Sequence, residues 1–320
     1  MHHWSVSEHK SIKSKWRSLM NYRIIILLLI ITYSAAIAYP TPEKSVKDAP
    51  EKTITTFAMN DGSDMTGHIV AENDSMYVVD LTTGFQMSIP KSSVLHIAEF
   101  KGRIIDGKIY DLDPNRSRYL WSVSAFPVGK EEAYCSDFCL VFPSFNFGVT
   151  KSISAQVGAM YFPGLSLKDM PFYAGAKMSL PTMGPFTTAA GIQYFTIPGL
   201  FDENERFGMG FLFTTGTLGD QFNHLSVSLG WGFLEFDGES SIMDRPIIIL
   251  AGNKRISNNF ALVSENWIIP DSDLGQIPIS LALRFIGKRI AVDFGGIIAL
   301  SMLDDGIVLP FPVINFAYHR

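Results

Sequence analysis

Residues 277–300 read IPISLALRFIGKRIAVDFGGIIAL, and this stretch decides the fold class of the chain. Its two halves alternate between bulky apolar residues and small or charged ones, and Gly287, Lys288 and Arg289 separate them. Alternation with a period of two is typical of β-strands, and a short glycine-containing turn between two such runs predicts a β-hairpin. One face of this hairpin is apolar, whereas the other carries Arg284 and Asp293 among small residues. Those two faces suit lipid outside and a polar interior, so the stretch predicts a transmembrane β-barrel.

The composition of the whole chain is poor in charge. Charged residues make up 18% of the 320 residues, whereas an ordinary soluble domain carries about 25%. The formal net charge is −5. A negatively charged chain is a poor match for a phosphate backbone, so we expect no nucleic acid among its partners.

Residues 1–38 have the pattern of a signal peptide. Lysines and arginines precede an apolar run at 24–32, and small residues follow from Ser34 to Ala38. This order predicts export with cleavage after Ala38, and an uncleaved anchor is the alternative. Residues 39–52 are rich in Pro, Lys, Glu and Asp and are predicted to be a linker.

Residues 53–100 contain about five short strand-like runs separated by turn signals, of which Asn60-Asp61-Gly62 is the clearest. With residues 66–70, 77–80 and 89–91, this pattern resembles the small SH3-like or Sm-like barrel. The resemblance implies a five-stranded barrel, a fold that binds RNA in Sm proteins. A basic surface with interleaved aromatic residues is missing here, so we expect a periplasmic protein partner instead. Residues 101–117 are predicted to be a connector.

Residues 118–320 contain about twelve strand-like runs, the first of them near Tyr119. The connections between them alternate in length. Short connections are expected at 150–152, 182–185, 219–223, 254–259 and 287–289, and longer, more acidic ones at 129–138, 163–170, 199–206, 237–244, 270–275 and 303–306. This alternation is typical of an antiparallel, up-and-down outer-membrane barrel with short periplasmic turns, and an even strand count puts both barrel ends in the periplasm.

Aromatic residues cluster at the predicted strand ends next to the long connections. We expect an aromatic girdle at the lipid–water boundary, formed by Tyr161, Phe172, Tyr173, Tyr194, Phe207 and Trp267. The alternative is a soluble β-sandwich, which would place its large aromatic residues in the middle of its strands.

Several motifs of residues 118–320 resemble an uncharacterised group of bacterial outer-membrane β-barrels of the Bacteroidetes type. They are SFNFGVT at 144–150, PGLSL at 163–167, DRP at 244–246, ALVSENW at 261–267, LRF at 283–285 and AVD at 291–293. The resemblance implies a place in the outer membrane, in contact with lipid and lipopolysaccharide, but no activity. Barrels of this class usually end on an aromatic residue, whereas His319 and Arg320 end this chain.

The candidate site residues face the predicted lumen on neighbouring strands. Glu265, Arg284 and Asp293 are expected to form one charged cluster, and Lys177 is a weaker candidate of the same kind. Such a cluster either lines a pore and sets its charge selectivity or satisfies polar groups inside a narrow barrel.

Two other sets of residues are candidates for chemistry. Cys135 and Cys139 are expected to form a loop disulfide or to remain two unpaired thiols, rather than to bind metal. We expect no cofactor and no metal, because no enzyme or phosphate-loop motif is present. His224 and Ser226 share a strand face, which leaves a membrane-embedded lipid hydrolase as a disfavoured hypothesis.

Two functions follow from the predicted barrel. The first is a channel or transport component for small solutes, favoured by glycines predicted to face inward, among them Gly175, Gly191, Gly208 and Gly210. The second is a structural or docking protein whose filled barrel anchors the small periplasmic domain.

Overall fold

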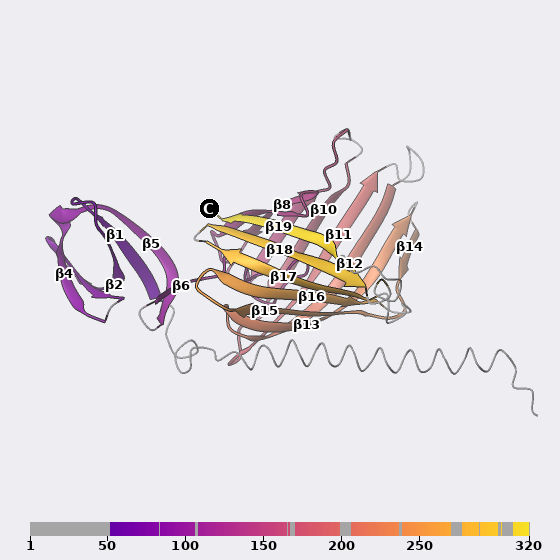
Figure 1. Ribbon diagram of the computed structural model, residues 1–320. Coiled ribbons are helices and arrows are strands. Elements are labelled where there is room, and N and C mark those ends of the chain that lie inside the picture. Colours follow the sequence, from indigo (N-terminus) through magenta and orange to yellow (C-terminus); the bar gives the residue numbers. More distant parts are fainter. Residues whose placement is uncertain are drawn as a thin grey trace, which may run out of the picture.

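The computed structural model describes residues 52–320 except 83, 106–107, 165, 167–169, 199–205, 237–238, 270–276, 288, 300–301, 303–309 and 320. These residues form two antiparallel β-sheets that follow one another along the chain (Figure 1). The predicted signal peptide and nearly all of the predicted linker lie outside the described residues, as do most of the acidic loop tips. Within the described residues, no helix is both long and apolar enough to span a membrane.

The first sheet has the order β4-β3-β2-β1-β5-β6. Its strands are β1 (Lys52–Met59), β2 (Asp64–Glu72), β3 (Met76–Leu81), β4 (Gln86–Pro90), β5 (Val94–Ile105) and β6 (Lys108–Asp111). Phe57, Val79 and Ile89 are its buried core. The five predicted strands are present, but the predicted closure into a small barrel is wrong: β5 continues into β6 instead of pairing with β4, so the sheet stays open.

The second sheet closes on itself. Its twelve barrel strands are β7 (Ala133–Phe138), β8 (Phe142–Gly148), β9 (Ile153–Ala159), β10 (Phe172–Ser179), β11 (Phe186–Pro198), β12 (Arg206–Gly219), β13 (Asn223–Phe236), β15 (Ile247–Arg255), β16 (Phe260–Ile268), β17 (Pro278–Ile286), β18 (Ile290–Ala299) and β19 (Phe311–His319). Each pairs antiparallel with the next, and β19 pairs with β7. The short β14 (Glu239–Ile242) pairs with the end of β13. The predicted twelve-stranded antiparallel barrel is confirmed.

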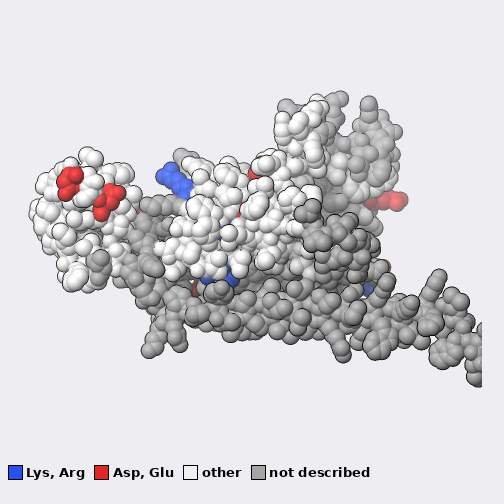
Figure 2. Space-filling model, viewed as in Figure 1, with Lys and Arg blue, Asp and Glu red and all other residues white. Residues whose placement is uncertain are grey.

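The β17–β18 hairpin shows how the sequence pattern produces the two surfaces of the barrel. Leu283 lies opposite Phe294 in the register, and both are exposed on the outside. Arg284 lies opposite Asp293, and both are buried inside. Because side chains alternate across a strand, large apolar residues cover the outer wall, and Figure 2 shows few charged side chains on the barrel face in view. A broad apolar exterior with polar residues inside is the surface of a transmembrane barrel.

Short connections lie at one end of the barrel and most long ones at the other. The exception is the link between β7 and β8, which joins these strands at the end of the long connections through residues 139–141 alone. With twelve strands, β7 begins and β19 ends at the end with the short connections. Figure 1 shows the C-terminus at the end of the barrel nearest the first sheet.

The first barrel strand begins at Ala133, so the strand predicted near Tyr119 is wrong. Residues 113–128, named here the inner segment, instead lie inside the barrel, and most of their side chains are buried. The apolar run around Tyr119 resembles a strand in sequence because burial in the lumen and burial in a wall select similar residues.

Candidate functional site in the barrel lumen

The inner segment makes a tight reversal that a wall carboxylate holds. Oε2 of Glu265 on β16 accepts hydrogen bonds from the backbone N–H groups of Leu120 (3.0 Å), Trp121 (2.9 Å) and Ser122 (2.8 Å). Its other oxygen, Oε1, accepts one from Nε1 of Trp267 at 2.7 Å. A buried carboxylate costs free energy unless it is hydrogen-bonded, and these four donors satisfy it. Glu265 therefore fixes the position of the turn.

A buried guanidinium joins the wall to the start of the inner segment. Nε and Nη2 of Arg284 donate to the two carboxylate oxygens of Asp293 at 2.6 and 2.9 Å. Nη1 of Arg284 donates to Oδ2 of Asp113 at 3.1 Å, and Nη2 also donates to the carbonyl oxygen of Tyr119 at 2.9 Å. Arg284 and Asp113 are fully buried. The bidentate pair belongs to the wall, whereas Asp113 and Tyr119 belong to the inner segment.

Lys177 on β10 binds the inner segment from the side of the barrel opposite β16 and β17. Its ammonium donates to the carbonyl oxygens of Ser124 (2.6 Å), Phe126 (2.7 Å) and Ser117 (3.3 Å). Three acceptors match the three N–H donors of a lysine. Lys177 therefore binds the backbone of the segment instead of a carboxylate.

The predicted cluster of Glu265, Arg284 and Asp293 is arranged differently from the expectation. The structure brings Arg284 and Asp293 together, whereas Glu265 binds the inner segment and Trp267. Asn315 on β19 also belongs to this site, since its side-chain amide donates to Asp293 Oδ2 and to the carbonyl oxygen of Leu120, both at 3.3 Å.

Asp113, like Asn315, is absent from the predicted site, because the sequence predicts that residues 101–117 form a connector. The available signal was the density of polar side chains in DPNRSR at 113–118 immediately before an apolar run. A solvated connector explains that composition equally well. Only the contact between Asp113 and Arg284 distinguishes a segment buried in the lumen from a solvated connector.

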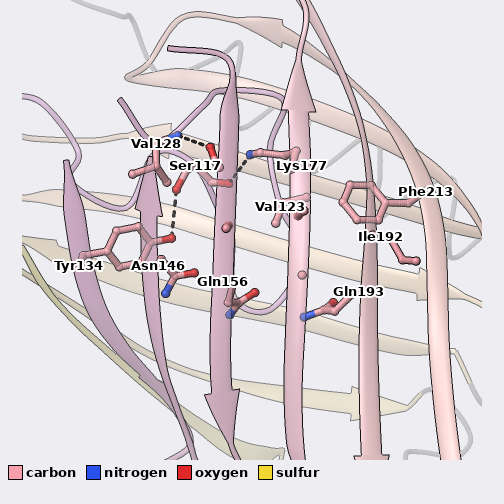
Figure 3. Close-up of a pocket in the computed structure, with 14 residues that line it drawn as sticks. Ser117, Val123, Val128, Tyr134, Asn146, Gln156, Lys177, Ile192, Gln193 and Phe213 are labelled. Atoms are coloured by element: carbon pink, nitrogen blue, oxygen red, sulfur yellow. Dashed lines mark hydrogen bonds between the residues drawn. The ribbon is translucent and has the colours of Figure 1, made fainter. Parts of the chain in front are cut away.

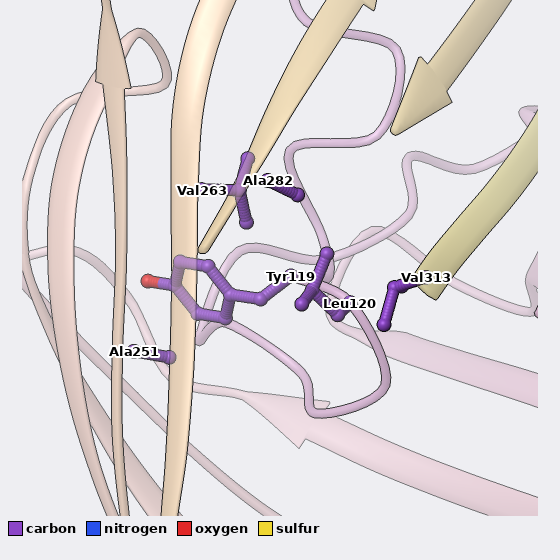
Figure 4. Packing of buried hydrophobic residues seen from close by; sticks show 6 residues of the cluster. All are labelled: Tyr119, Leu120, Ala251, Val263, Ala282 and Val313. Carbon is purple, nitrogen blue, oxygen red and sulfur yellow. The ribbon is translucent and has the colours of Figure 1, made fainter. Parts of the chain in front are cut away.

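Apolar contacts complete the packing of the inner segment (Figure 4). Tyr119 and Leu120 pack among Ala251, Val263, Ala282 and Val313 of the wall. The hydroxyl group of Tyr119 lies 2.6 Å from Oγ of Ser226, at the far end of a buried ring. Residues on β15, β16, β17 and β19 therefore contribute to one core together with the inner segment.

The hydrolase hypothesis finds no support in the geometry of His224. Nδ1 of this histidine lies 3.0 Å from the carbonyl oxygen of Asp220, and its ring packs against Tyr119 and Phe126. Oγ of Ser226 is hydrogen-bonded to Tyr119 and to Thr217. Oγ of Ser226 and Nδ1 of His224 are thus occupied by structural contacts, whereas the buried Nε2 of His224 has no hydrogen-bond partner among the described residues.

The predicted aromatic girdle is divided between the two faces of the wall. Tyr161 and Phe172 are exposed on the outside, and Tyr194 lies on the outside against Phe233. Tyr173 is buried in the lumen, where its ring contacts Trp121 and Phe195, and Trp267 faces the lumen toward Glu265. Phe207 is half-buried. Position at a strand end does not fix the face; strand parity does.

The predicted inward glycines are also divided. Gly175 and Gly191 face the lumen, as expected, whereas Gly208 and Gly210 lie on the outer face of β12, opposite Thr196 and Tyr194 respectively in the register. The Phe233 ring covers Gly210, only 1.9 Å from where a Cβ would lie. A glycine here makes room for an aromatic ring on the wall rather than for an open lumen.

A small cavity remains between the inner segment and the wall of β7 to β12 (Figure 3). Gln156, Gln193, Lys177 and Tyr134 line it. Its volume of about 50 Å³ holds only a few water molecules. The space beside these strands is therefore too small to be an open passage.

Cys135 and Cys139 are free thiols in the structure. Cys135 lies within β7, exposed on the outer face, and Cys139 follows the strand end. Residues four apart along an extended strand are about 13 Å apart, which is too far for a disulfide. Of the two alternatives from the sequence, the structure contains the unpaired thiols. Among the described residues, no group of His, Cys, Asp and Glu is arranged to hold a metal ion.

Comparison with solved structures gives distant likenesses. No protein-family model and no curated protein matches the chain. Among solved structures, OmpT, an outer membrane protein of Vibrio cholerae, is similar at 10% identity and a TM-score of 0.33, covering 84% of this chain and 96% of that chain. Its in-vitro folded form gives 11% identity and a TM-score of 0.34, over 84% and 97% of the two chains. CdiB from Acinetobacter baumannii is 9% identical with a TM-score of 0.23, and the match covers 84% of this chain and 59% of that chain. Scores this low carry no argument about function.

Proposed function

We propose that this chain is an outer-membrane β-barrel protein and a transport component whose lumen is closed at rest. The outer-membrane location is supported by the closed antiparallel wall with its apolar exterior, and by the export pattern of residues 1–38. The closed lumen rests on one observation. The inner segment is held by Glu265 and Arg284 on the neighbouring strands β16 and β17, and by Lys177 on β10 across the barrel.

The chemistry of these contacts favours a movable closure over a permanent filling. Burying charges costs free energy that apolar residues of the same volume would not cost. Ionic and charge-assisted hydrogen bonds instead fix one position of the segment, and water can replace them when the segment leaves. A lumen filled only for stability needs neither Asp113 nor Glu265.

The second candidate function is an anchor for a docking domain. The inner segment follows directly from β6 of the first sheet, and Tyr110 and Leu112 pack against Phe222 at the end of the barrel with the short connections. In this function the barrel holds the open sheet at the membrane surface, where a periplasmic protein binds it. The contacts of the inner segment then serve only to fix the sheet in place.

Conductance in planar bilayers tests the transport proposal. The intact barrel is expected to give rare, brief currents, whereas Glu265→Gln gives sustained ones, since a neutral amide holds the three N–H groups of residues 120–122 less strongly. Glu235→Gln is the matched control, because that carboxylate accepts a hydrogen bond from Tyr194 on the outer surface.

The result separates the two candidates. Sustained current through the intact protein contradicts the closed lumen. Absence of current from Glu265→Gln, in protein shown to be folded by heat-modifiable gel migration, contradicts transport and favours the anchor.

A further inference from the structure

The backbone hydrogen-bond ladder of the wall is incomplete between β16 and β17, although the two strands remain neighbours. Their backbone register runs only from Phe260 opposite Phe285 to Val263 opposite Ala282. On its other side β16 pairs with β15 as far as Ile268, and β17 pairs with β18 from Pro278 onward. The halves of β16 and β17 nearest the long connections therefore lack a shared backbone ladder.

Side chains occupy the place of the missing ladder at Glu265 and Ser280. The N–H of Glu265 donates to Oγ of Ser280 at 2.9 Å, and that hydroxyl donates to the carbonyl oxygen of Glu265. The N–H of Ser280 donates to Oδ1 of Asn266 at 3.2 Å. The carbonyl oxygen of Ser280 accepts from Oγ of Ser264 at 2.8 Å. All four backbone groups of this pair thus bond to side chains instead of to each other.

The bridging groups also place polarity on the lipid-facing surface. Ser264 and Asn266 alternate with the buried Val263 and Glu265, so they lie on the outer face of β16, among exposed residues such as Leu262 and Leu281. Polar side chains in contact with lipid are costly and mark functional positions by default. Here they satisfy backbone groups that lipid cannot.

The lumen directly behind this seam holds the tip of the inner segment. Glu265 belongs to the seam through its backbone and to the inner segment through its carboxylate. Leu120 packs there with Val263 and Ala282, which gives the lumen an apolar surface. Separation of the strands would shift Glu265 and join this apolar surface to the membrane interior.

We propose that the β16–β17 seam is a lateral portal that admits an amphipathic molecule, with an acyl chain and a polar head, between lumen and membrane. The proposal rests on the proposed transport function and names its substrate class. The acyl chain meets the apolar lumen near Leu120, and the polar head replaces the side-chain hydrogen bonds of Ser264 and Asn266 as the strands separate.

A disulfide across the seam tests the portal. Ser264→Cys with Leu281→Cys spans the unpaired part, at the positions where a continued register would place them opposite one another. Leu262→Cys with Leu283→Cys is the matched control, since that pair is already in register. Both pairs are made in a chain without Cys135 and Cys139.

The readout is quenching of lumen-facing tryptophans by phospholipids with brominated acyl chains. Trp4, Trp16 and Trp231 are replaced by Phe, so that fluorescence comes from Trp121 and Trp267. Quenching is expected to fall at least two-fold when the seam pair is oxidised and to return on reduction, with no change for the control pair. Equal quenching in the oxidised seam and control pairs overturns the portal.

Backbone amide exchange of the chain without introduced cysteines, in lipid nanodiscs, provides a second test that does not depend on the crosslink. Amides at 264–268 and 279–281 are expected to exchange at least ten-fold faster than those of β18, and equal protection overturns the portal. Neither readout requires conductance. If oxidation of the seam pair lowers quenching but no variant conducts current, the seam is an acyl-chain site and transport is rejected. If a variant conducts current but oxidation leaves quenching unchanged, only the portal is rejected.

Discussion

Nε of Arg284 lies 2.6 Å from Oδ1 of Asp293, and the two residues are directly opposite in the β17–β18 register. Cross-strand neighbours on one face of a hairpin are the nearest partners that a sheet offers. Asp113 completes this ion pair from another part of the chain. One guanidinium therefore joins the wall of the barrel to the segment that fills it.

The ion pair gives the first prediction. Arg284→Met is expected to destabilise the barrel by about 3–5 kcal/mol, because it leaves two buried carboxylates without a cation. Adding Asp293→Asn and Asp113→Asn should recover part of this loss, since neutral amides cost less to bury. Urea unfolding in detergent, followed by tryptophan fluorescence, measures both. A triple variant less stable than the single one contradicts the account.

Glu265 gives a prediction about local order. In Glu265→Gln, backbone amides of residues 120–122 are expected to exchange with solvent at least ten-fold faster, because their shared acceptor loses its charge. Amides of β18 should keep their protection. Unchanged exchange at 120–122 in this variant shows that the carboxylate does not hold the turn.

Two variants of Tyr119 separate the contributions of its hydroxyl group and of its ring to the stability of the barrel. Tyr119→Phe removes the hydrogen bond with Ser226 and is expected to cost about 1 kcal/mol. Tyr119→Ala leaves a cavity and is expected to cost about 3–5 kcal/mol. Thermal unfolding of both variants measures the difference. Similar costs for the two would mean that the ring is not part of the packed lumen.

The free thiols give a prediction about covalent state. Two equivalents of maleimide are expected to label Cys135 and Cys139 in denaturant without prior reduction. In folded protein in lipid, Cys135 should react slowly with a charged maleimide, because it lies on the outer face of β7. Mass spectrometry counts the labels. A requirement for reductant would show the disulfide alternative instead.

Outer-surface packing gives the last prediction. Gly210→Val is expected to lower the yield of folded barrel, since a Cβ at this position meets the ring of Phe233. Gly62→Ala on the first sheet is a poor control because Gly62 has a positive φ of 83°. Gly252→Ala is a better one, because its neighbours lie at ordinary contact distance. Heat-modifiable migration of refolded protein measures both yields.

Much of the wall was predictable because strand alternation is a local property. The pattern around Arg284 and Asp293 fixed their face, and the register of a short hairpin then made them neighbours. The first sheet shows the limit of such reasoning. Turn signals locate its strands, but whether β4 meets β5 depends on where the chain turns next, and β6 takes that place.

Most barrel strands and the inward position of Glu265, Arg284, Asp293 and Lys177 could be predicted from the sequence, because alternation along one strand does not depend on a distant contact. That residues 113–128 lie in the lumen, and that Glu265 binds their backbone, became visible only once the chain was folded. The same is true of the side chains that bridge β16 and β17. The contacts of the inner segment join residues more than a hundred positions apart. The bridges between β16 and β17 depend on backbone hydrogen bonding, which the alternation of residues does not predict.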